Sequence, residues 1–483
     1  MLFHSMAFAI FLPVVFLVYW LLPHRFRWAL LLLSSCYFYM SWNVGYIVLI
    51  LFTTLVSYIS ARMIEGAGTQ KKKRICVVST LTVSLGILFF FKYYNFFASS
   101  LTETLQRFAI ELHPKTLAVI VPVGISFYTF QTLSYVIDVY RGNVRAEHHF
   151  GKYAAFITFF PQLVAGPIER SGNLLPQIQE RKRFDYDQAS YGILLMVWGF
   201  FKKLVVADNL AIHVDAIYEN INNYTGLPLV VAALFFSLQI YCDFSGYSDI
   251  AIGTAKLFGI DLMTNFMSPY YSASIKEFWS RWHISLSSWF RDYVYIPLGG
   301  SRVGKVRYAI NTMVTFLASG LWHGAAWTYV YWGGVHGMAQ IFERHLTPGG
   351  GKVEQNIKHT IFWWGRVLIV FLLVSAAWIL FRAENMGTVI YMFQNMWKGI
   401  GQFESYWKNG IQQLGFGLVE PYLLGWVIFI LAVFDYLSLR RDVILSIRKL
   451  PVLLRWCIYV AALLTVVILS PTDSSKEFIY FQF

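Results

Sequence analysis

The apolar stretch SGLWHGAAWTYVYWGGVHG, residues 319–337, contains two histidines, His323 and His336. An imidazole can accept a proton, bind a metal or hydrogen-bond to a neighbouring helix. An ionisable side chain at membrane depth is costly, so its presence favours a functional site. Gly320 and Gly324 flank His323 with a four-residue spacing that lets another helix approach closely. We therefore predict that His323 lies in a helix contact or a cavity wall; the alternative is a neutral histidine that only joins two helices.

The spacing of the two histidines argues against a shared metal ion. On one continuous helix, His336 would lie about 220° further around the axis than His323, so the rings would face different sides. Gly333 and Gly337 lie close to His336, and packing explains this histidine as well as function does. No metal site or disulfide framework is predicted, because no CxxC spacing occurs among Cys36, Cys76, Cys242 and Cys457.

A second group of reactive residues lies at residues 272–302, SASIKEFWSRWHISLSSWFRDYVYIPLGGSR. Lys276, His283 and Phe290 are spaced by seven residues, so on one helix they form a single stripe. The tryptophans are typical of membrane-interface anchors, and the basic residues suit an anionic ligand such as a phosphorylated cofactor. The alternative is an interfacial amphipathic helix without a ligand. These residues are Trp279, Trp282, Trp289, Arg281, Arg291, Arg302, Lys305 and Arg307.

Two aspartates, Asp243 and Asp249, lie on either side of Gly246, where we expect a helix break. Either they cap the two broken helix ends or they bind a proton or a substrate. The adjacent His148 and His149 lie in a polar loop and are expected to be solvated. The sequence contains no GxSxG, P-loop, GxGxxG or HExxH motif, so any chemistry is expected to be intramembrane and histidine-based.

The composition places these residues in a membrane protein. Hydrophobic residues make up 57% of the 483-residue chain and charged residues only 13%, whereas soluble domains are roughly 25% charged. The first apolar run, 5–22, has no basic residues before it and no small-residue cleavage site after it, so we predict a retained span. The chain is therefore predicted to be an all-α polytopic membrane protein.

The apolar runs predict roughly ten to twelve transmembrane helices, each of about 17–25 residues, together with interfacial helices. Prolines and glycines interrupt the runs at 117–137 and 153–166, which are predicted to be re-entrant or broken helices. The other runs are 5–22, 28–42, 45–63, 74–93, 190–207, 226–243, 308–330, 361–381, 422–439 and 453–470.

The net charge of +13 is distributed as membrane topology requires. By the positive-inside rule, the loops that contain Arg25, Arg27 and Lys71–Arg74 are predicted to be cytoplasmic. Both chain termini are then predicted to lie on the outer side of the membrane. A nucleic-acid partner is not predicted, because the charge reports orientation. The rule also assigns the cytoplasmic side to the clusters at Arg181–Arg183, Lys202–Lys203 and Arg440–Lys449.

Five segments, in order, resemble the membrane-bound O-acyltransferase (MBOAT) superfamily and, within it, the bacterial alginate O-acetylation branch. The likeness covers nearly the whole chain and is most specific between Pro122 and Gly337. It implies one membrane domain, 1–483, with N-terminal spans (1–115), a motif-bearing core (116–345), C-terminal spans (346–483) and a central funnel or tunnel. The segments are PVGISFYTFQTLSYVIDVYRG, FFPQLVAGPIER, YCDFSGYSDIAIG, FWSRWHISLSSWFRDYVYIPLGGSR and LASGLWHGAAWTYVYWGGVHG.

The resemblance implies that His323, in LWHG, is the catalytic residue and that His283, in RWHIS, is the second. A neutral imidazole is the usual general base for an attacking hydroxyl, and burial would keep His323 uncharged. His283, or a backbone amide beside it, would orient the donor or polarise its carbonyl. Further residues expected to contact the donor are Lys276, Trp279, Arg281, Trp282, Arg291, Trp322 and His336.

The resemblance also implies the substrates and partners. The donor would be acetyl-CoA or another cytoplasmic acyl thioester, with no metal and no permanently bound cofactor. The acceptor would be an exported polysaccharide, reached through an extracytoplasmic partner of the SGNH-hydrolase-like type, at the bacterial cytoplasmic (inner) membrane. Direct transfer and an acyl-histidine relay are both compatible with the sequence.

Several functions other than polysaccharide O-acetylation also fit these residues. D-alanyl transfer to teichoic acid, peptidoglycan O-acetylation and cellulose O-acetylation belong to the same class. The runs at 422–439 and 453–470 favour acetylation, because D-alanyl-transferring relatives generally end sooner after the WHG region. A transporter or flippase would explain buried histidines and aspartates without chemistry, although the chain shows no matching interrupted halves. A structural scaffold for a partner enzyme is the third class.

Overall fold

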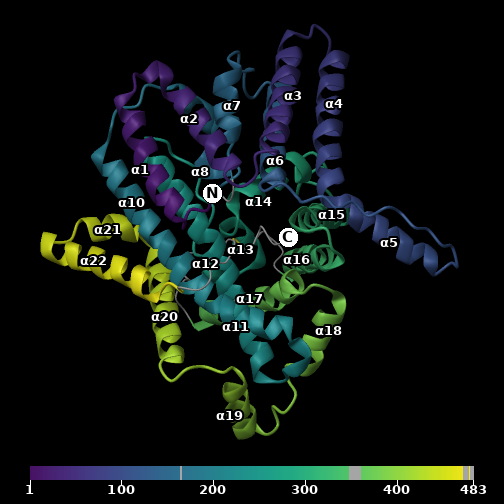
Figure 1. Ribbon diagram of the computed structural model, residues 1–483. Coiled ribbons are helices and arrows are strands. Elements are labelled where there is room, and N and C mark those ends of the chain that lie inside the picture. The colour runs from purple at the N-terminus through teal and green to yellow at the C-terminus, as the bar shows by residue number, and fades with distance from the viewer. Residues whose placement is uncertain (164–165, 347–360, 472–477, 479–483) are drawn as a thin grey trace. The chain divides into compact units, whose positions relative to one another are not determined.

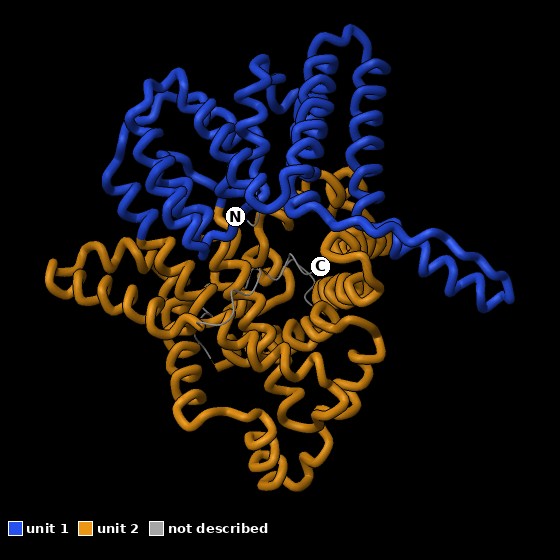
Figure 2. The backbone as a smooth tube through the Cα atoms, in the orientation of Figure 1, with its two compact units in different colours: residues 1–193, 250–263 blue, residues 194–249, 264–483 orange. Residues whose placement is uncertain are grey.

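The computed structural model describes the whole chain except residues 164–165, 347–360, 472–477 and 479–483. Every regular element in the described residues is a helix (Figure 1), which agrees with the predicted all-α membrane fold. The chain forms two compact units (Figure 2). Unit 1 comprises Met1–Ile193 and Ile250–Met263, and unit 2 comprises Leu194–Asp249 and Thr264–Phe483. The predicted division of one domain at 1–115, 116–345 and 346–483 stays a prediction.

The helices of the N-terminal part belong to unit 1. They are α1 (Met6–Leu21), α2 (His24–Met40), α3 (Ile47–Gly66), α4 (Gln70–Leu88), η1 (Phe89–Tyr93), α5 (Tyr94–Gln106), α6 (Ile125–Arg141), α7 (Phe150–Thr158), α8 (Phe160–Leu163) and α9 (Ser171–Gln179). Two helices contribute to both units, namely α10 (Tyr186–Phe200) and α12 (Leu227–Leu257).

The remaining helices belong to unit 2. They are η2 (Phe201–Ala207), α11 (Asp208–Glu219), η3 (Ile221–Asn223), η4 (Pro269–Tyr271), α13 (Ile275–Arg281), α14 (Ile284–Phe290), η5 (Arg291–Tyr295), α15 (Lys305–His323), α16 (Trp327–Leu346), α17 (Ile361–Arg382), α18 (Met386–Asn395), α19 (Phe403–Gln413), α20 (Glu420–Ser438), α21 (Val443–Arg448) and α22 (Val452–Leu469).

Seven described helical segments are long and apolar enough to cross a membrane, which makes this a multi-pass membrane protein. Sequence patterns predict roughly ten to twelve spans. The count differs partly because α1 and α2 have only 16 and 17 residues. The seven segments are Ile47–Gly66, Gln70–Gln106, Tyr186–Glu219, Leu227–Leu257, Ile361–Arg382, Glu420–Ser438 and Val452–Leu469.

Interrupted apolar runs account for the rest of the difference between the predicted number of spans and the seven described segments. In the run at 117–137, helix α6 begins only at Ile125, after Gly124 adopts a left-handed backbone with φ of 76°. In the run at 153–166, α7 ends at Thr158 and the short α8 follows. Both runs are interrupted, as predicted. The run at 308–330 is interrupted as well, because α15 ends at His323 and Gly324 is extended.

Polar contacts between helices stabilise unit 1. The Thr80 hydroxyl on α4 donates to the Ser60 hydroxyl on α3 at 2.7 Å. One turn earlier on α3, the Ser57 hydroxyl is hydrogen-bonded to the Tyr153 hydroxyl at 2.7 Å, which joins α3 to α7. Small hydroxyl residues are suited to such contacts because they let helices approach closely while satisfying each other's hydrogen bonds.

Gly246 does not break a helix, so that prediction is wrong. Helix α12 continues from Leu227 to Leu257. A Cβ atom at position 246 would lie 2.7 Å from the carbonyl oxygen of Gly199 on α10. Gly246 is therefore needed for a close approach of two helices within unit 2, because any side chain there would collide with backbone.

Glycines also bring α15 and α16 together, as the small-residue spacing predicts. A Cβ atom at Gly320 would lie 2.2 Å from the carbonyl oxygen of Tyr329, and one at Gly333 would lie 2.3 Å from that of Phe316. Both distances are far below van der Waals contact. The two helices therefore meet backbone against backbone, and this contact fixes the end of α15, where His323 lies.

The α15–α16 contact gives the first prediction. We expect Gly333→Ala to lower the free energy of unfolding by about 1–3 kcal/mol, because the added methyl group would collide with the Phe316 carbonyl. Gly334→Ala is the matched control: its Cβ would meet only Leu317 Cδ2, at 3.7 Å. Thermal unfolding of both variants in detergent measures the difference, and equal melting temperatures would contradict the close contact.

Candidate active site

The two histidines His283 and His323 lie together in unit 2. Their ring centroids are 6.4 Å apart. Both side chains are buried, with exposed fractions of 0% and 3%. His323 is the last residue of α15, and His283 immediately precedes α14. The ends of two helices that are 40 residues apart in the sequence thus bring two imidazoles to one place.

The backbone at His283 adopts the left-handed conformation, with φ of 44° and ψ of 53°. For a residue with a side chain this conformation costs about 1–2 kcal/mol, and such strain gathers at functional sites. The predicted stripe of Lys276, His283 and Phe290 on one helix is wrong, because α13 ends at Arg281 and α14 begins at Ile284. The break buries His283 and leaves Lys276 exposed.

Aromatic rings surround both histidines. The ring centroid of His323 lies 4.9 Å from that of Trp322, 5.0 Å from that of Trp332 and 5.4 Å from that of Phe381. His283 packs against Phe244 at 4.6 Å. Burial disfavours the imidazolium ion, and it holds the pKa of His283 below its usual value. A neutral imidazole retains one nitrogen that can accept a proton.

His336 belongs to a neighbouring aromatic cluster of unit 2. Its ring centroid lies 5.0 Å from that of Trp279 and 5.0 Å from that of Trp332, which also contacts His323. The assumption of one continuous helix is wrong, since α16 begins at Trp327. Among the described residues, neither ring nitrogen of His336 has a hydrogen-bond partner. One indole therefore separates His336 from the histidine pair.

The tryptophans predicted to contact a donor gather near the histidines. Trp322 lies 6.0 Å from His283 between ring centroids. Trp282 is fully buried and packs at 5.1 Å against Phe266, whose ring is 6.5 Å from that of His283. The structure therefore brings these indoles into the surroundings of the candidate site.

The predicted cationic residues behave differently. Arg281 pairs with Glu277 at 2.6 Å, and Arg291 pairs with Asp292 at 2.8 Å. Lys276 is exposed, and its backbone N–H donates to a carboxylate oxygen of α16. The two arginine charges are thus paired with neighbouring carboxylates, and a role of all three cations in donor binding stays a prediction. In the part of the chain that the structure describes, no three His, Cys, Asp or Glu side chains lie close enough to hold a metal ion.

The sequence patterns do not reveal a group of buried ion pairs in unit 2. Lys203 Nζ lies 2.8 Å from Asp208 Oδ1 and 2.7 Å from Asp243 Oδ1, and Lys202 Nζ lies 2.6 Å from Asp249 Oδ2. Both lysine side chains are buried within an apolar helical segment and not in an exposed loop, so the assignment of this cluster to the cytoplasmic side stays a prediction. A signal was available, since adjacent lysines inside an apolar run require buried partners.

A π-helical segment places these lysines against α12. Residues Phe201–Ala207 form η2, whose wider turn is frequent at functional sites. Asp243 and Asp249 are on α12 and face one lysine each. Since α12 is continuous there, the idea that these aspartates cap broken helix ends is wrong.

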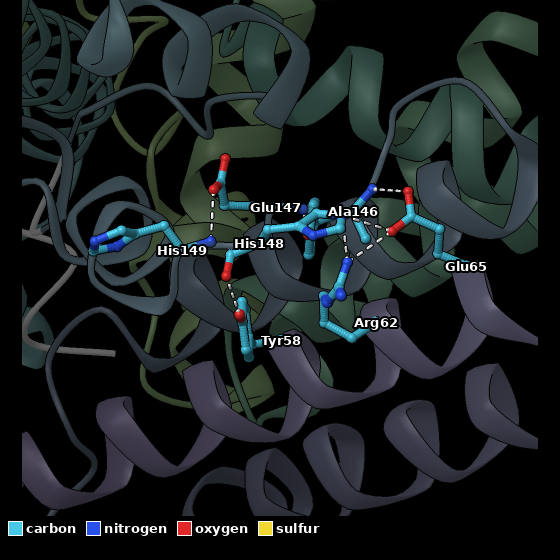
Figure 3. A network of polar contacts seen from close by, with 8 residues as sticks. Tyr58, Arg62, Glu65, Ala146, Glu147, His148 and His149 are labelled. Atoms are coloured by element: carbon cyan, nitrogen blue, oxygen red, sulfur yellow. Dashed lines mark hydrogen bonds and ion pairs between the residues drawn. The ribbon is translucent and has the colours of Figure 1, made fainter.

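The polar loop with His148 and His149 lies in unit 1, and Figure 3 shows its hydrogen bonds and ion pairs. Tyr58 donates to the His148 carbonyl oxygen at 2.7 Å, and His148 Nε2 lies 3.1 Å from Glu65 Oε2 and contacts Arg62. The His148 side chain is 68% exposed, so it is solvated as expected, but it is also tied to α3. These partners all lie on α3, so the contacts hold the loop against this helix.

Comparison with known proteins identifies the class to which this fold and site belong. The family model for the membrane-bound O-acyltransferases matches residues 143–380, which include both His283 and His323. The chain belongs to the membrane-bound O-acyltransferase family and is a membrane acyltransferase that uses an acyl donor.

Three relatives show the range of acyl transfer in this family. The chain is 41% identical over 379 residues to the probable alginate O-acetylase AlgI of Pseudomonas aeruginosa, covering 78% of this chain and 71% of that protein. It is 34% identical over 411 residues to the peptidoglycan O-acetyltransferase of Helicobacter pylori, covering 79% and 76%. It is 30% identical over 238 residues to the teichoic acid D-alanyltransferase of Streptococcus thermophilus, covering 45% and 56%.

The buried ion pairs give the second prediction. Lys203→Met would leave Asp208 and Asp243 buried without their cation, so we expect the free energy of unfolding to fall by roughly 3–5 kcal/mol. The triple variant Lys203→Met/Asp208→Asn/Asp243→Asn removes the charges together and should recover most of that loss. Thermal unfolding in detergent compares the two variants, and a wild-type melting temperature for Lys203→Met would contradict a stabilising ion pair.

Proposed function

We propose that this chain transfers an acetyl group from acetyl-CoA toward hydroxyl groups of an exported cell-surface polysaccharide. The observation that supports this most is the pair of buried imidazoles, His283 and His323, whose ring centroids are 6.4 Å apart. Hydrogen bonds span about 3 Å, so two rings at this spacing can contact groups of one substrate. The relatives named as O-acetylases and O-acetyltransferases support acetyl as the group transferred.

In the proposed reaction, His323 is the general base. Its imidazole removes the proton of the acceptor hydroxyl while the oxygen attacks the thioester carbonyl carbon. A C–O bond forms, the C–S bond breaks, and the proton passes from the imidazolium to the departing thiolate. The products are an acetyl ester and a free thiol. His283 contacts the donor as the second residue of the site.

The surroundings of His323 support this chemistry. Trp322, Trp332 and Phe381 pack around the ring, and only 3% of His323 is exposed. A water-poor site slows the competing hydrolysis of the thioester. Burial in general disfavours a charged side chain, and the neutral imidazole is the form that accepts a proton.

We further propose that the donor enters from the cytoplasmic side of a bacterial inner membrane and that both termini lie outside. Arg25, Arg27 and Lys71–Arg74 support this orientation by the positive-inside rule. An extracytoplasmic partner of the SGNH-hydrolase-like type would receive the acetyl group and pass it to the polysaccharide. The alginate and peptidoglycan names of the relatives support a cell-envelope polymer as the final acceptor.

The third prediction tests His323 as the base. His323→Gln keeps a hydrogen-bonding side chain but loses basicity, so acetyl transfer in membrane vesicles should fall by about 10²–10⁴-fold. His113→Gln is the matched control, because the His113 side chain is 83% exposed and lies in unit 1. Transfer of labelled acetyl groups measures both variants. Substantial activity in His323→Gln would instead support a transporter, whose substrate flux would persist without any thioester.

The fourth prediction concerns the donor. A D-alanyl group on a carrier protein is the second candidate, supported by the similarity to a teichoic acid D-alanyltransferase. We expect vesicles to incorporate label from acetyl-CoA and not from a D-alanyl carrier protein, with His323→Ala as the inactive control. Incorporation from the carrier protein alone would assign the chain to D-alanyl transfer.

A further inference from the structure

Asn265, in the segment between α12 and η4, forms an unusually dense set of hydrogen bonds beside His283. Its side-chain oxygen lies 3.1 Å from His283 Nδ1, 2.9 Å from the Ser285 hydroxyl and 3.3 Å from the Ser285 backbone nitrogen. Its side-chain nitrogen donates to the Ser248 hydroxyl on α12 at 3.2 Å. Asn265, Ser285 and Ser248 are all buried.

The Ser285 backbone determines which way the Asn265 amide points. A backbone N–H can only donate, so the side-chain atom that faces it must be the amide oxygen rather than the nitrogen. An amide oxygen can only accept. His283 Nδ1 faces the same oxygen, and it also lies 3.4 Å from the Ser285 hydroxyl. That hydroxyl gives its one hydrogen to the Asn265 oxygen, so it cannot donate to Nδ1, and Nδ1 must itself be protonated and donate.

The tautomer of His283 follows from this contact. In a neutral imidazole, a proton on Nδ1 leaves Nε2 with its lone pair. His283 therefore presents a hydrogen-bond acceptor to the reaction. It cannot polarise a thioester carbonyl through Nε2, because polarising a carbonyl requires a donor.

We propose that Asn265 is a positioning residue that holds His283 in the Nδ1–H tautomer, so that Nε2 accepts a hydrogen bond from the amide N–H of the acyl donor's cysteamine arm. This inference rests on the proposed function. The two substrates are the acceptor hydroxyl and the acyl donor. The hydroxyl has one proton, which goes to His323, so it cannot also donate to His283. The amide N–H closest to the thioester sulfur is then the remaining group near the reacting carbon with a hydrogen to donate. Coenzyme A and carrier-bound pantetheine share this amide.

The backbone of His283 decides which variants test the proposal. Asparagine tolerates the left-handed conformation observed there, whereas alanine adds strain. In His283→Asn, the amide nitrogen can take the place of Nδ1 and donate to Asn265, while nothing replaces Nε2. This variant keeps the local structure and removes only the proposed contact with the donor.

The experiment compares two small donors in membrane vesicles, S-acetyl-N-acetylcysteamine and an alkyl thioacetate of matched length without the amide. The wild type should prefer the amide-bearing donor by roughly 3- to 10-fold in kcat/KM, the effect of one neutral hydrogen bond. Asn265→Leu and His283→Asn should each abolish this preference, mainly through the KM of the donor. Asn265→Asp keeps an acceptor oxygen beside His283 Nδ1, so this variant should retain the preference for the amide-bearing donor.

The outcomes separate this inference from the proposed function. If the wild type transfers acetyl groups but Asn265→Leu and His283→Asn retain the preference, the positioning role is wrong and the acyltransferase proposal stands. If the wild type transfers from no thioester, the proposed function itself fails. The double variant Asn265→Leu/His283→Asn should have the same KM for the amide-bearing donor as either single variant, and an additive rise in that KM would contradict action of Asn265 through His283. The preference is a ratio of two kcat/KM values measured on the same sample, so partial misfolding does not change it. If Asn265→Leu does not fold, His283→Asn still tests the contact between His283 and the donor amide.

Discussion

The organisation of unit 2 depends on one constraint: a polar or charged group buried among apolar helices must find a partner there. Helix α12 shows how this constraint is met. Asp243 and Asp249 on this helix pair with two lysines of η2. The same helix provides Ser248, which bonds to Asn265, and Phe244, which packs on His283. The ion pairs that neutralise α12 therefore also fix the helix from which the site is positioned.

Interrupted helices are the second requirement of the site. His283 lies in the break between α13 and α14, and His323 lies at the end of α15. A break leaves backbone groups without helical partners, and such groups must be paired when they are buried. Here the freed backbone N–H groups of Ile284 and Ser285 both bond to Asn265. One residue thus stabilises the break and contacts the imidazole that the break presents.

The sequence predicts the membrane fold and the meeting of His283 and His323, because composition, small-residue spacing and family motifs are properties of short segments. It does not predict the pairing of Lys202 and Lys203, because two of their three aspartate partners lie on α12 and the charges alone suggest a loop. Asn265 is missed for a similar reason: its role arises from a left-handed turn near residue 283 that no local pattern marks. The predicted helix break at Gly246 is wrong because a glycine that breaks a helix and one that admits a neighbouring helix look the same in a sequence.

Burial alone does not distinguish a reactive histidine from one that packs. His283 and His336 are both fully buried among aromatic rings in unit 2. They differ in their polar contacts: His283 Nδ1 faces Asn265, whereas among the described residues neither nitrogen of His336 has a hydrogen-bond partner. A fixed partner on one nitrogen defines the tautomer and so the chemistry of the other nitrogen. An imidazole without such a partner has no contact that defines its proton position, and the contacts observed for His336 are ring contacts with Trp279 and Trp332.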